Sequence, residues 1–176
     1  MKHFELTLAA LAAFYQTASA LPPVSQWYTT LKSPNERFVL NAQQALVATE
    51  AAAAVAANNS SPSSIVITDP SGFVISLLRM DNAWIESVDT CIRKARTVSL
   101  FNGAFTSGDL NPIVQPGSED YGLDTTNGGM LAVAGAIPLF INGTFFAAIG
   151  VCGGSGKQDI DAATAGVYAV GGTLTL

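Results

Sequence analysis

The chain has 176 residues and a formal net charge of −5, and 49% of its residues are hydrophobic. This length suits one domain with a substantial core. Because charged residues are few and scattered, the composition argues against a nucleic-acid-binding protein and against one that binds an anionic membrane surface.

The first twenty residues have the pattern of a secretory signal peptide. A short basic start at residues 1–3 precedes an apolar segment at residues 6–14, and Ala18-Ser19-Ala20 supplies a small-residue cleavage site. The segment is too short to span a bilayer, and no later apolar stretch is long enough to do so. We therefore assign residues 1–20 to a signal peptide and expect a secreted protein with no membrane partner.

Secretion changes how the sequons and cysteines are interpreted. Three asparagines in predicted turns begin N-x-Ser/Thr sequons and are candidate glycosylation sites: Asn58, Asn59 and Asn142. The two cysteines, Cys91 and Cys152, would meet an oxidising compartment.

An N-terminal arm at residues 21–34 precedes the predicted domain, which occupies residues 35–176. Ser33-Pro34-Asn35-Glu36 combines an N-cap, a proline at the first helical position and a glutamate at the third. An Ala-rich helix is expected from there to about Ala57, where a turn cluster ends it.

Two apolar runs then predict a hairpin, with strands at residues 65–68 and 73–80 joined by a tight turn. A helix over residues 83–101 follows, with one apolar and one charged face. Lys94 lies off the charged stripe, beside Ser87 and Thr90. It is therefore the charged residue of this helix that stands most apart from the solvated face.

The second half begins with a turn-rich segment over residues 102–129, and a loop of this length is often a lid or binding loop. Strands are predicted at about residues 130–134, 137–142 and 144–151, with Asn142-Gly143 as a hairpin turn. The order of helices and strands predicts an α+β domain with an antiparallel sheet of about five strands and packed helices.

The last helix has a well-defined start. Ser155 and Gln158 form a capping box, and the helix is expected to continue to about Val170. The preceding glycines do not form a P-loop, because Gln158 stands where that motif requires Ser or Thr.

Gly153 and Gly154 lie between the last strand and this helix. Glycines leave backbone N–H groups unobstructed, and free N–H groups at a helix N-terminus bind anions such as carboxylate or phosphate. In the alternative interpretation the turn is a plain connection, and Asp159 in the first helical turn already satisfies the helix dipole.

Histidine chemistry is excluded from the predicted mature chain, because the only histidine, His3, leaves with the signal peptide. That chain has no Ser–His or Cys–His catalytic pair, no zinc cluster and no histidine haem ligand. The residues alone predict no metal site and identify no catalytic residue.

Several segments occur in a specific order: residues 67–72 (ITDPSG), 79–83 (RMDNA), 94–97 (KART), 135–138 (GAIP) and 149–154 (IGVCGG), ending at Gln158-Asp159. This set resembles the haem-degrading GlcG/HbpS-type family, which includes the C-terminal domain of some corrinoid adenosyltransferases. The resemblance covers roughly residues 37–171. It implies a profilin-like fold, frequent homo-oligomers, and haem or another tetrapyrrole as the ligand or cofactor.

The chain departs from the family pattern at Ala136, Cys152 and Lys157, where the family usually has Gly, Ser and Glu. Because Cys152 replaces the usual residue, the resemblance suggests that its thiol arose with a partner. A Cys91–Cys152 disulfide would close a loop of about sixty residues and contribute roughly 4 kcal/mol. The alternatives are two buried free thiols and a Cys152 thiolate whose pKa is lowered by the nearby helix N-terminus.

The predicted ligand site combines the glycine turn with neighbouring charges. It comprises Arg79, Asp81, Lys94, Cys152, Gly153, Gly154, Ser155, Gln158 and Asp159. In this hypothesis the turn and Lys94 or Arg79 hold a ligand carboxylate, and the loop at residues 102–129 closes over it. In the alternative, Arg79, Asp81 and Lys94 form an internal ion-pair network beneath the turn.

Three functions follow from these observations. The first is a secreted binder or weak degrader of a carboxylate-bearing tetrapyrrole such as haem. The second is a histidine-free enzyme, such as an isomerase or cyclase, acting on a small organic acid or secondary metabolite. The third is a structural or interaction protein.

Overall fold

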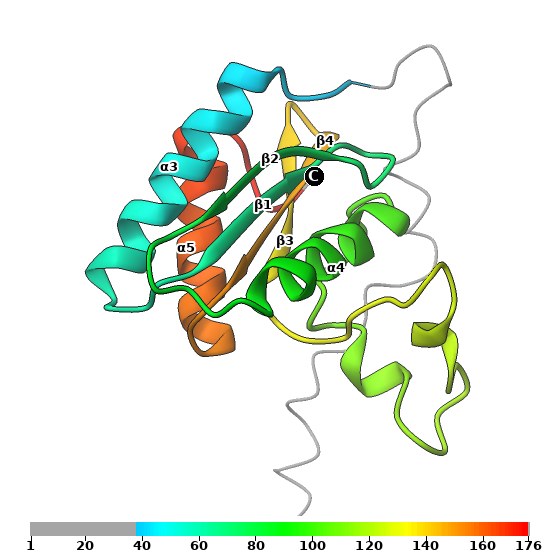
Figure 1. Ribbon diagram of the computed structural model, residues 1–176. Coiled ribbons are helices and arrows are strands. Elements are labelled where there is room, and N and C mark those ends of the chain that lie inside the picture. The colour runs from blue at the N-terminus through cyan, green and yellow to red at the C-terminus, as the bar shows by residue number, and fades with distance from the viewer. Residues whose placement is uncertain (1–37, 176) are drawn as a thin grey trace, which may run out of the picture.

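The computed structural model describes residues 38–175, and its centre is one antiparallel sheet between two layers of helix (Figure 1). The strands are β1 (Ser64–Thr68), β2 (Val74–Arg79), β3 (Ala136–Ile141) and β4 (Thr144–Cys152), in the order β2-β1-β4-β3. The α+β prediction is confirmed, with four strands where about five were expected.

The missing strand is the one predicted at residues 130–134, and that prediction is wrong. This segment satisfies its backbone groups with side chains instead of a neighbouring strand. The Leu131 N–H donates to Thr97 Oγ1 at 2.9 Å, and Ser107 Oγ donates to the Val133 carbonyl at 2.6 Å. These bonds to side chains replace the backbone hydrogen bonds that a neighbouring strand would provide.

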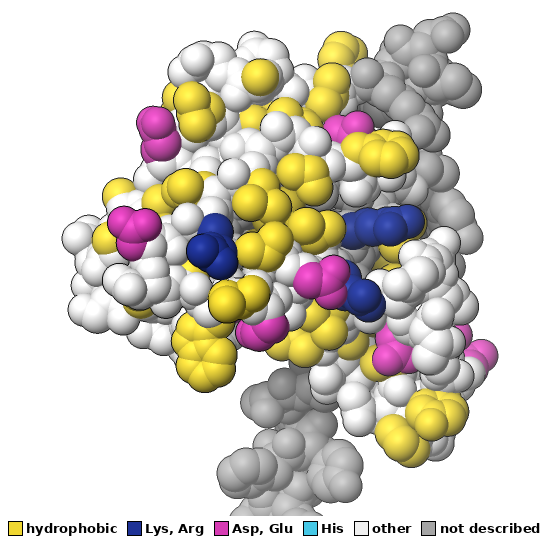
Figure 2. Space-filling view, viewed as in Figure 1, with side chains coloured by type: hydrophobic (Ala, Val, Ile, Leu, Met, Phe, Trp, Pro, Cys, Tyr) yellow, Lys and Arg dark blue, Asp and Glu magenta, His cyan; other side chains and the backbone are white. Residues whose placement is uncertain are grey.

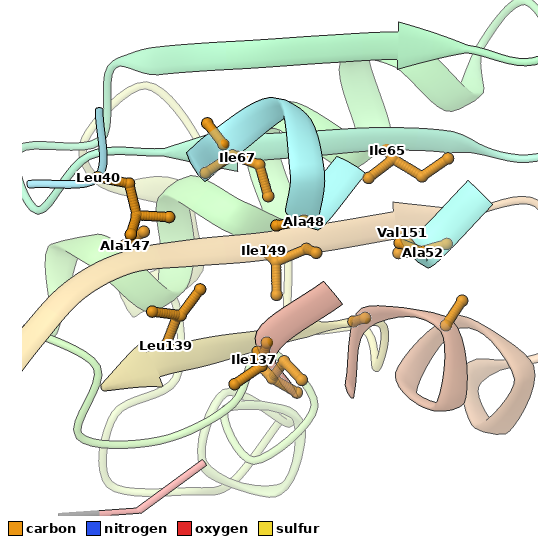
Figure 3. Packing of buried hydrophobic residues seen from close by; sticks show 14 of the residues in the cluster. Leu40, Ala48, Ala52, Ile65, Ile67, Ile137, Leu139, Ala147, Ile149 and Val151 are labelled. Atoms are coloured by element: carbon orange, nitrogen blue, oxygen red, sulfur yellow. The ribbon is translucent and has the colours of Figure 1, made fainter. Parts of the chain in front are cut away.

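Each face of the sheet buries a different set of side chains. On one face α3 (Ala42–Asn58) and α5 (Gly156–Ala169) pack together over alternate residues of β1, β4 and β3. Figure 3 shows Ala48 and Ala52 of α3 beside Ile65, Ile149 and Val151. On the other face α4 (Ser87–Leu100) covers β1, β4 and β3. This alternation is what a strand's period of two requires when both faces are buried.

The start of α3 corrects one prediction. Residues 38–41 are not helical, so a continuous helix from Ser33, which itself lies outside the described residues, is wrong. Asn41 is the N-cap: its side chain accepts from the Gln44 N–H at 2.9 Å, and Gln44 Oε1 accepts from the Asn41 N–H at 3.0 Å. This reciprocal box fixes the helix start four residues past the beginning of the described chain.

Two other local predictions are confirmed. Ser155 caps α5 with Gln158 at the third position. Asn142 and Gly143 have φ of 50° and 70°, the pair of positive values that a two-residue hairpin of the primed type requires. The helix predicted from residue 83 begins instead at Ser87, after a turn, and Ser87 Oγ donates to the Trp84 carbonyl at 2.6 Å.

The long segment after α4 is an ordered unit that contains two short 3-10 helices, η3 (Asn111–Ile113) and η4 (Leu123–Thr125). It has a small apolar core of its own, comprising Phe105, Leu110, Val114, Met130 and Ala132. Its role as a lid stays a prediction.

Candidate functional site

A buried ion pair lies at the end of β4. Lys94 reaches there from α4 and Asp159 from the first turn of α5, and Lys94 Nζ lies 3.1 Å from Asp159 Oδ2. Lys94 also donates to the carbonyl of Val151 at 3.4 Å. The side chains are 5% and 3% exposed, so water does not screen the pair. These two are the charged residues that lie buried among residues 38–175.

The electrostatic balance of the pair shows how much it depends on its neighbours. Burial alone would lower the pKa of Lys94, but the adjacent Cys152 and Asp159 outweigh burial and raise that pKa. Burial raises the pKa of Asp159, although the Gly154 N–H and Lys94 oppose the change. Each group therefore relies on the other to keep its charge in a site with little water.

The glycine turn is aimed at this pair. The Gly154 N–H donates to Asp159 Oδ1 at 2.9 Å, and the nearby Gly153 N–H helps to lower the pKa of that carboxyl. The Ser155 N–H is taken by Gln158 Oε1 at 2.9 Å. The expectation that these N–H groups are free for an outside anion is therefore wrong. Asp159 occupies that position itself, as the alternative interpretation of the turn proposed.

Glycine is required here because the turn approaches the chain at residues 61–63. A Cβ on Gly154 would lie 2.6 Å from Ser61 Oγ and 2.9 Å from Gln158 Cβ, and one on Gly153 would collide with the Pro62 carbonyl. The residues of the turn are nonetheless exposed on their outer side. Ser61 Oγ is buried against this turn, and it is the buried side-chain polar atom without a hydrogen-bond partner in the described chain. Ser61 could not be predicted as part of the site, because nothing in its local pattern separates it from the turn cluster.

The two cysteines meet beneath the same turn as buried free thiols, and no disulfide joins them. Cys91 Sγ donates to the Ser64 carbonyl at 3.2 Å, and Ser64 is the residue paired with Cys152 across β1 and β4. Burial raises the pKa of Cys91 well above its ordinary value of 9.0. The neighbouring Cys91 thiol and the charge of Lys94 lower the pKa of Cys152 despite its burial.

Arg79 and Asp81 do not join the buried cluster. Both are exposed at the end of β2, and among the described residues Lys94 pairs with Asp159 alone. The proposed internal network of Arg79, Asp81 and Lys94 is therefore wrong. The structure divides the predicted site into a buried half around Lys94 and an exposed half at the end of β2.

No group of three or more His, Cys, Asp or Glu side chains between residues 38 and 175 could hold a metal ion. Within the same residues no helix has the length and apolarity needed to cross a membrane.

The architecture defines a class of protein: an α+β domain in which a four-stranded antiparallel sheet carries two helices on one face and one on the other. Within that class, residues 40–168 match the family described as haem degrading protein HbpS-like, and the chain belongs to this family.

Curated relatives support the assignment. An uncharacterized 15.0 kDa protein from the dhaT-dhaS intergenic region of Citrobacter freundii is 32% identical over 99 residues, which are 56% of this chain and 68% of that protein. The corrinoid adenosyltransferase PduO of the same organism is 30% identical over 132 residues, or 74% of this chain. The chain spans only 39% of PduO.

Solved structures give the same result. A PduOC:haem complex superposes with a TM-score of 0.72 at 27% identity, covering 78% of this chain and 99% of that one. A Streptomyces reticuli HbpS double mutant superposes with a TM-score of 0.68 at 28% identity, covering 85% and 97%.

Proposed function

We propose that the chain binds haem or a related carboxylate-bearing tetrapyrrole. The observation that carries this proposal is the family match over residues 40–168 to a family described as haem degrading. It is supported by the similarity in fold to PduOC, which was solved as a haem complex and is matched over 99% of its length. Adenosyl transfer is not proposed, because the chain spans only 39% of the enzyme PduO.

The outer side of the turn at residues 153–155 is where a ligand carboxylate fits best. The hydroxyl of Ser61 lies against Gly154 and has no hydrogen-bond partner in the described chain. The Ser61 residue as a whole is 7% exposed. An unpaired buried hydroxyl is destabilising unless something accepts its proton. A ligand carboxylate would accept that hydrogen bond once a shift of the exposed turn uncovers Ser61 Oγ, which is buried in the structure.

The iron of a bound haem would find few strong ligands in the described chain, since the only histidine of the protein is His3. Cys152 is the softest donor of the predicted site, but it is buried and committed to Cys91 and Lys94. We therefore propose that the ligand is held by its carboxylates and apolar ring rather than by its metal.

Titration with haem and with iron-free protoporphyrin IX tests this proposal. We expect a saturable Soret change at one ligand per chain, with affinities that agree within about tenfold, a difference of about 1.4 kcal/mol. Ser61→Ala should weaken both by about tenfold or more, as for a hydrogen bond to a charged group. The exposed Ser71→Ala variant is the control. Absence of saturable binding would overturn the proposal.

The enzyme hypothesis is less favoured by the geometry. Lys94 and Asp159 are its strongest polar groups, and they are buried and paired with each other. A substrate would have to break that pair to reach either side chain.

We also propose that the protein is secreted and glycosylated. These proposals rest on residues 1–20, which lie outside the described part, and on sequons whose asparagines are exposed in the structure, namely Asn58, Asn59 and Asn142. The N-terminus of extracellular protein should be Leu21, and endoglycosidase treatment should reduce the mass if the sequons are used.

We also propose that the chain forms homo-oligomers through the edge of β2. The other edge strand, β3, contains Pro138 and is covered by the C-terminal segment, because Phe140 and Thr173 exchange backbone hydrogen bonds of 3.0 and 2.8 Å. A proline and a covering segment are devices that protect a sheet edge from other chains.

Among residues 38–175, no proline or covering segment protects the edge at β2 in this way. Val74, Leu77 and Leu78 are 44%, 43% and 37% exposed, and Figure 2 shows hydrophobic side chains gathered near the centre of the face that carries β2. Arg79 is the only charge of the strand. Antiparallel pairing with a second copy would put the two arginines at opposite ends, each near the other copy's turn that holds Asp69.

Light scattering after size-exclusion chromatography tests the interface. We expect the wild-type chain to be at least dimeric and Leu77→Lys to be monomeric, because a buried unpaired charge opposes association. Tyr168→Lys, which places the same charge on an exposed aromatic position of α5, is the control. A monomeric wild type, or an unchanged mass for Leu77→Lys, would contradict the proposal.

A further inference from the structure

Two thiols that the proposed ligand binding does not use are held together in the core. Gly150 makes this possible: a Cβ there would lie 2.8 Å from the Cys91 carbonyl oxygen and 3.1 Å from Ala95 Cβ. Because Gly150 has no side chain, α4 approaches β4 closely at this point, two residues before Cys152. Cys91 on the helix and Cys152 on the strand therefore share one buried cluster, and the Cys91 thiol donates to Ser64, the residue paired with Cys152.

The surroundings of the two sulfur atoms differ. Cys152 lies beside the Lys94 ammonium, which also bonds Asp159 and the Val151 carbonyl, and it is followed directly by the exposed turn. Cys91 is fully buried and donates to the carbonyl of Ser64, an acceptor that favours the protonated thiol. A cation beside one thiol and a carbonyl beside the other give the pair an attacking and a resolving member.

We propose that Cys91 and Cys152 form a reversible dithiol–disulfide site for a small peroxide oxidant. Cys152 is the attacking thiol, Cys91 is the resolving thiol, and Lys94 is the positioning residue that stabilises the Cys152 thiolate.

The chemistry balances with hydrogen peroxide as the oxidant. The Cys152 thiolate attacks one peroxide oxygen, the O–O bond breaks, and hydroxide leaves and takes up the thiol proton as water. The product is a sulfenic acid on Cys152. Cys91 then attacks that sulfur, an S–S bond forms, the S–O bond breaks, and a second water carries away the Cys91 proton. Two thiols are oxidised and one peroxide is reduced to two waters.

Burial selects the oxidant by size. Cys152 is 3% exposed and Cys91 is 0% exposed, so a peptide disulfide such as oxidised glutathione cannot reach either sulfur without local opening. Hydrogen peroxide is far smaller than oxidised glutathione, and the turn that directly follows Cys152 is exposed. The site should therefore distinguish peroxide from larger disulfides.

The first experiment uses the full chain, reduced under native conditions and then exposed to peroxide or to oxidised glutathione. After denaturation, free thiols are alkylated and counted by mass spectrometry. We expect peroxide to remove both labels and oxidised glutathione to leave both. Dithiothreitol, which is much smaller than oxidised glutathione, should restore the labels without unfolding. Two labelled cysteines after peroxide would overturn the proposal. So would a bond that is reduced only in denaturant, since that bond would be structural.

Single variants test the two roles. Cys91→Ser should accumulate a sulfenic acid on Cys152 that dimedone traps, whereas Cys152→Ser should react at least about tenfold more slowly and yield no dimedone adduct. Equal trapping in the two variants would overturn the assignment of roles.

Lys94→Met should slow trapping in the Cys91→Ser background by about tenfold or more and shift its pH profile upward. Lys157→Met removes an exposed ammonium of the same helix-terminal region and should leave the rate unchanged. If Lys94→Met leaves both rate and pH profile unchanged in folded protein, Lys94 has no part in the reaction.

Discussion

The two halves of the predicted site carry the same kinds of charge in opposite surroundings. Lys94 and Asp159 are buried at the end of β4 and bonded to each other, while Arg79 and Asp81 are exposed at the end of β2. A motif that groups such residues along the sequence does not say which of them the fold buries. The position of Lys94 off the charged stripe of its helix does indicate that this residue is buried.

The difference has energetic consequences. A buried ion pair is tightly coupled, because removing one partner leaves a charge with neither water nor a counter-ion. An exposed charge keeps its water and contributes little. Substitutions in the two halves should therefore differ in their effect on stability by several kcal/mol.

Breaking the buried pair should have the largest effect. Lys94→Met should lower the free energy of unfolding by about 3–5 kcal/mol, because Asp159 keeps its charge and loses its cation. Urea denaturation monitored by circular dichroism measures the change.

The matched control is the double variant Lys94→Met, Asp159→Asn, which removes both charges and leaves an amide that can still accept from the Gly154 N–H. The double variant should regain much of the unfolding free energy that Lys94→Met loses. If the double variant is as unstable as the sum of the single ones, the two residues are not coupled and the comparison between buried and exposed halves fails.

The turn that covers the buried pair should be the next most sensitive feature. Gly154→Ala should lower the free energy of unfolding by about 1–3 kcal/mol, since its Cβ would lie 2.6 Å from Ser61 Oγ. Adding Ser61→Ala should recover part of the loss by removing the colliding oxygen; the denaturation midpoints of the two variants show whether it does.

The pH dependence of stability sharpens the comparison further. The pKa of Lys94 is raised from 10.5 by Cys152 and Asp159, which outweigh its burial. Between pH 10.5 and the higher pKa of the folded state, folded Lys94 keeps a proton that the unfolded chain has released. Stability therefore falls as the pH rises through the folded pKa. This stabilisation is fully present below pH 10.5. Denaturation at alkaline pH should show a steeper loss for the wild type than for Lys94→Met; parallel curves would contradict the assignment.

Local signals explain which features the sequence could predict. The capping box at Ser155 and the Asn142-Gly143 hairpin depend on neighbouring residues only, and both are confirmed. The segment at residues 130–134 looks like a strand in isolation, but its backbone bonds to Thr97 and Ser107, which are distant in sequence. No local pattern contains that information.

The same limit applies to the site. The sequence placed Lys94, Cys152 and Asp159 in one site, and the structure brings them together. It could not show that Asp159 takes the turn's N–H groups, because that depends on how deeply the side chain is buried. It also could not show that Ser61 lies against Gly154, since the two belong to segments far apart in the chain.

The exposed half should show the smallest effect on stability. Arg79→Ala and Asp81→Ala should each change the free energy of unfolding by no more than about 0.5 kcal/mol, as is usual for exposed positions. Arg79→Ala should nevertheless weaken self-association if β2 pairs with a second copy, because it removes the only charge of that strand. Denaturation at a low protein concentration measures the stability of the monomer alone. Light scattering across a concentration series measures self-association. A loss of stability in the monomer comparable to that of Lys94→Met would show that Arg79 belongs with the buried half after all.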